Sequence, residues 1–167
     1  MLILGLDPGS VHTGYGLVDK HGSSVALVEV GTLSCPARQP LLWRLARISA
    51  DLVDLVERCR PATAVLEAPF YGLNVRSLVV LAQARGALLA VLGDRGIEIR
   101  EYTPAEIKSA VTGNGRAGKD QVARMVRLLL GLEGDWRSDA TDALAVALCA
   151  AHRFKADRIL SLHGGRK

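Results

Sequence analysis

The stretch Met1-Leu-Ile-Leu-Gly-Leu-Asp7-Pro-Gly9 decides the fold, because it places a carboxylate at the end of an apolar run. Residues 2–7 have the pattern of a buried strand, and the Pro-Gly pair ends it. An acid at the tip of a buried strand is unfavourable unless it is paired or binds a metal. Asp7 therefore predicts either a solvent-facing hairpin turn or a functional site at the end of the first strand.

The segments that follow predict an α/β fold in which helices flank a mixed five-stranded sheet. The further strands are expected over residues 13–20, 24–34, 63–67 and 97–102. The helices are expected over residues 40–60, 75–93, from Pro104 onwards, 119–131 and 139–156. Three neighbouring strands, then alternating helices and strands, are typical of one covered sheet. We expect one domain over residues 1–156 and a basic C-terminal tail over residues 157–167.

The helix over residues 40–60 has leucine and isoleucine at helical spacing. Its charged positions are expected to face out: Arg44, Arg47, Asp51 and Asp54.

Three more carboxylates stand where a structural reason is needed. Glu67 ends the apolar run Ala64-Val-Leu, and Asp139 and Asp142 open an alanine-rich segment. The last two share one helix face, where like charges repel. Capping of the helix explains Asp139 well but explains Asp142 less well, because Asp142 borders the apolar face. If these acids converge with Asp7, they build a site for hard divalent cations.

The net charge of +4 is unevenly distributed along the 167 residues. Residues 1–102 hold ten basic and ten acidic side chains, whereas residues 103–167 hold eleven basic and seven acidic ones. Cations that hold phosphates beside acids that hold metal suit a nuclease. The alternative is a solvated basic tail that keeps the protein in solution.

The sequence shows no sign of secretion or membrane insertion. The start lacks a basic region, Asp7 interrupts it, and no apolar run approaches the ~18 residues of a membrane span. The three cysteines are odd in number and widely spaced, which argues against a disulfide framework. We expect a cytoplasmic protein that does not contact membranes.

A glycine-rich segment nearly spells a nucleotide-binding loop. Gly113 and Gly118-Lys119 have the required spacing, but Asp120 stands where a magnesium-binding Ser or Thr is needed, and a helix precedes the loop. ATP binding is therefore not expected. The loop still brings Arg116, Lys119 and helix amides toward an anion, which suits a DNA phosphate.

Two features around residues 70–93 concern surfaces. Phe70 and Tyr71 follow Glu67 in a loop, where Phe70 either stacks on an unpaired base or plugs the core. Arg76 is a candidate DNA contact beside them. The helix over residues 75–93 is apolar nearly all round, with the small residues Ala82, Gly86 and Ala90 in one row. Such a helix either packs on the sheet alone or also contacts a second subunit.

Taken together, these motifs resemble the RuvC family of Holliday-junction resolvases, and the resemblance runs nearly end to end. The segments that carry it are Asp7-Pro-Gly-Ser-x-x-Thr-Gly-Tyr-Gly, Glu67-x-x-Phe70, Gln83-Ala-Arg-Gly86, Glu101-Tyr-Thr-Pro-x-x-Ile-Lys108, Lys119-x-x-Val-x-x-Met-Val126 and Asp139-x-x-Asp142-Ala-Leu-Ala.

The resemblance implies a ribonuclease-H-like fold, a homodimer and Mg²⁺-dependent cutting of four-way DNA junctions in recombination and repair. It implies that the catalytic, metal-binding acids are Asp7, Glu67, Asp139 and Asp142. They would hold two Mg²⁺ ions per site, with Mn²⁺ as a substitute. Lys108 and Lys119 match the family's basic residues near the scissile phosphate, and a branch-migration complex is the expected partner.

Two other functions stay open at this point. One is a catalytically idle junction-binding module of the same fold, against which the complete acid set argues. The other is a fragment of an actin-like ATPase, since an acid and a glycine after the first strand also begin that fold. The absence of a second phosphate-binding loop motif from the sequence argues against the ATPase.

Overall fold

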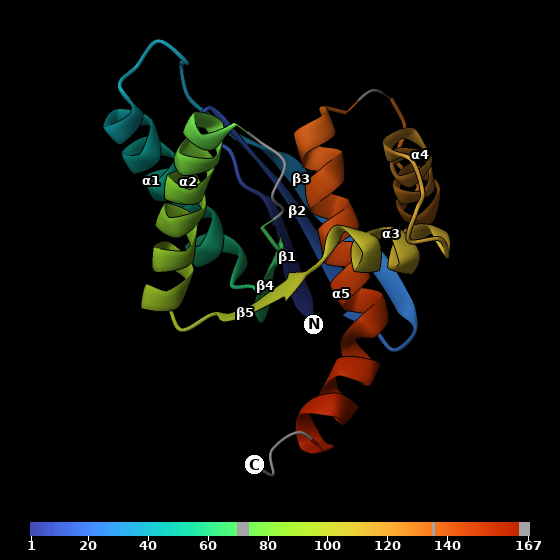
Figure 1. Cartoon of the computed structure of the whole chain (residues 1–167). Helices are drawn as coiled ribbons and strands as arrows, with labels where there is room; N and C mark the ends of the chain where they lie inside the picture. Colours follow the sequence, from blue (N-terminus) through green and yellow to red (C-terminus); the bar gives the residue numbers. More distant parts are fainter. Residues whose placement is uncertain (70–73, 135, 164–167) are drawn as a thin grey trace.

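The computed structural model describes residues 1–69, 74–134 and 136–163, with side chains described up to residue 153. The strands are β1 (Leu2–Asp7), β2 (His12–His21), β3 (Ser24–Ser34), β4 (Thr63–Glu67) and β5 (Glu98–Tyr102). The helices are α1 (Leu41–Cys59), α2 (Val75–Asp94), α3 (Pro104–Thr112), α4 (Lys119–Leu130) and α5 (Ser138–His163). Figure 1 shows a central sheet with helices on both sides.

The five strands form one mixed sheet in the order β3-β2-β1-β4-β5, which confirms the predicted fold class. The pairs β1–β2 and β2–β3 are antiparallel, whereas β4 is parallel to both β1 and β5. Antiparallel neighbours follow from the hairpins, and parallel neighbours follow from the helical crossovers.

Each face of the sheet has its own hydrophobic core. Alternation along β1 sends Leu4 and Leu6 to the side covered by α1 and α2, where they pack with Leu52 and Leu88. Ile3 points to the opposite side, which α3, α4 and α5 cover. The sheet is therefore a buried middle layer, and its strand ends are the places where polar side chains can reach solvent.

Glycines let α5 lie directly against β1 and β2. A Cβ on Gly5 would collide with the carbonyl oxygen of Ala143, and one on Gly14 would collide with that of Asp139. These glycines admit the backbone of α5, which brings the start of this helix over the end of β1.

Two details differ from the sequence-based expectation. Helix α5 continues to His163 instead of ending at residue 156, because no glycine or proline interrupts the chain before Gly164. Arg44, expected to face out, donates hydrogen bonds to the carbonyl and the hydroxyl of Ser10 at 3.3 and 2.9 Å. It thereby ties α1 to the turn that follows Asp7.

Candidate functional site

Asp7 and Glu67 lie at the carboxyl ends of neighbouring parallel strands. The ladder between β1 and β4 pairs Leu6 with Leu66, so the next residue of each strand is an acid. The turn after Asp7 is fixed locally, because the Thr13 hydroxyl donates to the Gly9 carbonyl at 2.9 Å. Two acids that lie 60 residues apart in the sequence are thus brought to one sheet edge.

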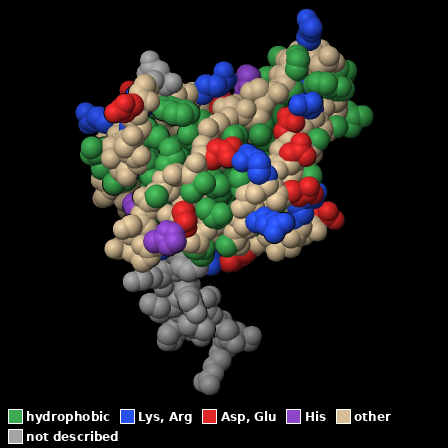
Figure 2. All heavy atoms as spheres, turned by 180° about the vertical axis from the view of Figure 1, so that it is seen from behind, with side chains coloured by type: hydrophobic (Ala, Val, Ile, Leu, Met, Phe, Trp, Pro, Cys, Tyr) green, Lys and Arg blue, Asp and Glu red, His purple; other side chains and the backbone are tan. Residues whose placement is uncertain are grey.

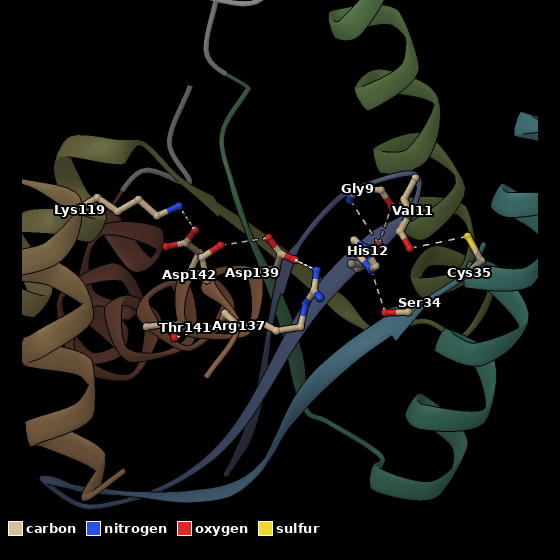
Figure 3. Close-up of polar contacts among 12 residues, drawn as sticks. Gly9, Val11, His12, Ser34, Cys35, Lys119, Arg137, Asp139, Thr141 and Asp142 are labelled. Atoms are coloured by element: carbon tan, nitrogen blue, oxygen red, sulfur yellow. Dashed lines mark hydrogen bonds and ion pairs between the residues drawn. The ribbon is translucent and has the colours of Figure 1, made fainter. Parts of the chain in front are cut away.

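Asp139 and Asp142 reach the same edge from the first turns of α5. Figure 3 shows Lys119, from the first residue of α4, pointing toward Asp142. The Lys119 ammonium lies 2.7 Å from the Asp142 carboxylate. Arg137 approaches Asp139 at 3.4 Å, and the Ser138 hydroxyl lies at the same distance from that carboxylate.

A cavity of about 760 Å³ opens beside the acids. Glu67, Asp142, Lys108 and Lys119 contribute its charged walls. The remaining walls come mostly from apolar residues of the β4 end, α3, α4 and α5, among them Ala68, Pro69, Pro104, Ile107, Val122 and Val146. The cavity therefore offers an acidic end with two ammonium groups.

Burial and mutual repulsion perturb two of the carboxylates. Burial, followed by the charges of Asp142, Asp139 and Glu67, raises the pKa of Asp7 from 3.8 to about 7, and the charge of Lys119 offsets only part of this shift. Burial also raises the pKa of Glu67, followed by the charge of Asp142, while Lys108, Lys119 and Arg85 oppose the shift. The hydrogen bond to Asp142 raises the pKa of Lys119.

The donor chemistry of this cluster fits a hard divalent cation, since it consists of carboxylates that lack enough positive charge. Within the described residues, no three acidic, histidine or cysteine side chains already converge as a ligand set. Lys119 and Arg137 instead engage two of the four carboxylates. A bound metal ion would have to replace these two ion pairs. Lys119 and Arg137 therefore act as internal counterions of the acidic site.

The protein-family model described as "Crossover junction endodeoxyribonuclease RuvC" matches residues 3–150 of this chain. The chain belongs to the RuvC family. A relative from Halorhodospira halophila is 45% identical over 165 residues, covering 99% of this chain and 98% of its own. One from Anaeromyxobacter sp. (strain K) is 48% identical over 149 residues, covering 89% and 80%. Both carry the name crossover junction endodeoxyribonuclease RuvC.

Solved structures agree with this membership. T. thermophilus RuvC in complex with a Holliday junction substrate superimposes with a TM-score of 0.87 at 31% identity, covering 94% of this chain and 96% of that one. A yeast mitochondrial Holliday junction resolvase has a TM-score of 0.67 at 13% identity, covering 95% and 82%, which concerns the fold alone. The predicted family and its ribonuclease-H-like fold are confirmed.

The structure brings together six of the residues predicted from the RuvC resemblance, the four acids and the two lysines. Arg116 is exposed on the loop before α4 and is not part of the cavity wall. Arg76 is exposed in the first turn of α2. Phe70 and Tyr71 lie outside the described residues, so their predicted DNA contacts stay predictions.

Two arginines at the site received no role from the sequence. Arg137 pairs with Asp139, and the Arg85 guanidinium donates to the Glu67 carbonyl oxygen at 2.7 Å. Arg85 was visible only as part of the Gln83-Ala-Arg-Gly86 segment of the RuvC resemblance. A cation in the middle of a mostly apolar helix is the signal that could have marked it, because such a charge needs a partner.

The raised pKa of Asp7 predicts an unusual pH dependence of stability in the metal-free protein. Between pH 3.8 and about 7 the native state keeps a proton that the unfolded state has released. The free energy of unfolding should therefore fall as pH rises through this window and level off above it. Urea unfolding in EDTA across the window measures this slope. Asp7→Asn should flatten it, and equal slopes in both proteins would contradict the prediction.

Proposed function

We propose that this chain is a Mg²⁺-dependent, structure-selective endonuclease that resolves Holliday junctions by paired symmetric nicks during recombination and DNA repair. Membership of the RuvC family supports the proposal. The observation that carries it is that Glu67, Asp139 and Asp142 lie close enough to Asp7 to raise its pKa, with Lys108 and Lys119 in the wall of the adjoining cavity. Burial and then the charges of the other three acids raise the pKa of Asp7 to about 7.

The four carboxylates would hold two Mg²⁺ ions, for which Mn²⁺ can substitute. When bound, such ions activate a water nucleophile and stabilise the leaving oxygen of a phosphodiester. The protein's own contribution is to place the acids on β1, β4 and α5, three elements that share one hydrophobic core.

Lys119 and Lys108 would act on the DNA phosphate. Lys119 donates to Asp142 in this structure, and if Asp142 bound a cation instead, the ammonium would be available to neutralise a neighbouring phosphate oxygen. Lys108 lines the same cavity from α3. Arg76 and Arg116, both exposed, would contact phosphates farther along the junction arms.

The partner of this chain in solution would be a second copy of itself, with α2 at the contact. Helix α2 packs Ala84, Leu88 and Leu92 on the sheet, whereas Val75 is 78% exposed and Val79 is 51% exposed. The start of α1, the helix beside α2, also exposes Leu42 and Trp43. Apolar side chains gather at the corresponding upper right corner of Figure 2.

By length and composition alone, α2 is also long and apolar enough to cross a membrane, although Arg76 and Arg85 interrupt its apolar run. We favour a second protein copy over lipid, because Arg85 in the middle of the helix is committed to partners within the fold. A two-fold dimer also matches the near two-fold symmetry of a four-way junction.

Gly86→Glu should weaken the dimer by at least about a hundredfold, because it buries an unpaired charge at the contact. A side chain at Gly86 meets no atom within 4 Å in the single chain, so the subunit itself should fold normally. Sedimentation equilibrium measures the effect, with Ala50→Glu on α1 as a matched exposed control. Wild-type protein that is monomeric at micromolar concentration would contradict the dimer.

Phe70 would stack on an unpaired base next to the cut. Phe70→Ala should lower the nicking rate about tenfold or more while changing the melting temperature little, because base stacking contributes roughly 1–3 kcal/mol per base. Phe70→Trp should retain part of the activity. Parallel loss of melting temperature and nicking in Phe70→Ala would instead indicate a core position.

Location and further partners follow from this function. A resolvase acts on chromosomal junctions, so we propose a cytoplasmic protein that works with a branch-migration complex. Pull-down of such a complex with junction DNA present tests that part of the proposal.

The deciding experiment incubates purified protein with a labelled four-way junction and with a matched linear duplex, each with and without Mg²⁺. We expect symmetric paired nicks in the junction, with Mg²⁺ only. Junction binding without nicking in Mg²⁺ or Mn²⁺ would indicate the catalytically idle module. ATP hydrolysis without DNA would indicate the ATPase alternative.

A further inference from the structure

Arg85 links α2 to the end of β4 through two strong contacts. One guanidinium nitrogen donates to the Glu67 carbonyl oxygen at 2.7 Å, and another lies 2.6 Å from the Glu101 carboxylate. The Arg85 side chain is only 12% exposed, so water does not screen these contacts fully. Hydrogen bonds from a charged donor at such distances are among the stronger ones in proteins.

Glu67 needs such a restraint because it is the last residue of β4. The ladder from β4 to β1 ends at Leu66, so at Glu67 only β5 remains as a paired neighbour, through Tyr102. The chain leaves the sheet directly afterwards. Arg85 returns from the third turn of α2 and holds the Glu67 backbone on which the carboxylate depends.

Arg85 also sits between the two faces of α2. The neighbouring Ala84 is buried against the sheet, whereas Gly86 is exposed with open space around it. A shift or rotation of α2 on contact with a second copy would therefore move the Arg85 guanidinium and, with it, the end of β4.

We propose that Arg85 is the positioning residue that sets the metal affinity of Glu67 and couples it to the packing of α2. This inference rests on the proposed function, since it assigns Glu67 to the metal site. Arg85 contacts the Glu67 carbonyl and the Glu101 carboxylate, so its role would be exerted through the Glu67 backbone. Because coupling between two binding events is reciprocal, metal at the acids and the second copy at α2 should each favour the other.

The test compares wild-type protein with Arg85→Lys, which keeps the charge but cannot span both acceptors. Arg95→Lys is the matched control, because Arg95 follows the same helix and also joins a carbonyl, that of Val91, to an acid, Glu57. Glu101→Gln is a milder second variant that leaves the bond to Glu67 available. Mn²⁺ alone serves as the probe in calorimetry, and Mg²⁺ is titrated in the nicking assay.

Arg85→Lys should weaken Mn²⁺ binding by about tenfold or more, the usual effect of losing a group that orients a metal ligand. Excess Mg²⁺ should restore most of the nicking, and the metal-free melting temperature should change little. Glu101→Gln should lie between this variant and wild type, and Arg95→Lys should match wild type. In wild-type protein Mn²⁺ should tighten the dimer, an effect that Arg85→Lys should lose.

Unchanged Mn²⁺ affinity in Arg85→Lys would overturn the positioning role. So would a loss of metal-free melting temperature in step with the loss of metal binding, since that is what a merely structural ion pair gives. A wild-type dimer dissociation constant that does not change when Mn²⁺ is added would overturn the coupling. All of these results presuppose a wild-type protein that nicks junctions, whereas a wild type that never nicks would count against the proposed function itself.

Discussion

Asp7→Asn is expected to lower the rate of junction nicking by at least about a thousandfold, equivalent to roughly 4 kcal/mol of transition-state stabilisation. Asp7 ends β1, and the three other carboxylates all act on its pKa, so it stands closest to the centre of the cluster. Asparagine keeps the shape of the side chain but removes the charge that a divalent cation needs. Single-turnover nicking of a labelled junction in saturating Mg²⁺ measures the loss.

Junction binding should survive in this variant, because it depends on lysine and arginine contacts to phosphates. The metal-free fold should be as stable as wild type or more so above pH 7, since a buried and repelled charge is gone. Asp54→Asn, exposed on α1, is the matched control and should nick normally. Nicking of Asp7→Asn at the wild-type rate would contradict the assignment of the site.

Lys119→Ala is expected to lower the nicking rate by about a hundredfold to a thousandfold, the range seen when one preorganised positive donor is removed from a transition state. In the metal-free structure its ammonium is held 2.7 Å from Asp142, within reach of the acids and the cavity. In this variant the pKa of Asp7 should be higher than in the wild type, because the Lys119 charge that lowers it is gone. The acid limb of the pH–rate profile would then move upward.

Arg124→Ala provides the matched control, as an exposed cation on the same helix that is not part of the cavity wall. It should nick at nearly the wild-type rate. If Lys119 also contacts phosphate before the reaction, the salt dependence of binding should flatten by about one charge in Lys119→Ala. In calorimetry, ATP should bind neither the wild type nor Lys119→Ala. Normal cutting by Lys119→Ala, or ATP binding that depends on Lys119, would refute the assignment of Lys119 to the DNA phosphate.

Much of the fold followed from local patterns. The run before Asp7 and the run before Glu67 predicted strands that end in acids, and the structure has β1 and β4 over these residues. Thr103-Pro104 predicted a helix start, and the structure has a capping box there with Glu106. These features depend on neighbours within a few residues, which is why the sequence alone could supply them.

Other features depend on residues that only folding brings together. Arg44 and Arg85 both looked like ordinary helical cations, yet one holds the turn after Asp7 and the other holds Glu67. Nothing in the spacing along the chain says that a guanidinium 18 positions beyond Glu67 returns to its carbonyl. The pairing of Asp139 with Arg137 was equally invisible.

The sequence by itself therefore determined which residues are candidates for the chemistry, because a carboxylate at the end of a buried strand or along an apolar helix face can be recognised locally. Only the tertiary structure decided how they meet. Parallel pairing places Asp7 beside Glu67, and the glycines of β1 and β2 admit α5 with Asp142. Such contacts depend on the packing of layers in three dimensions, and no local periodicity encodes that packing.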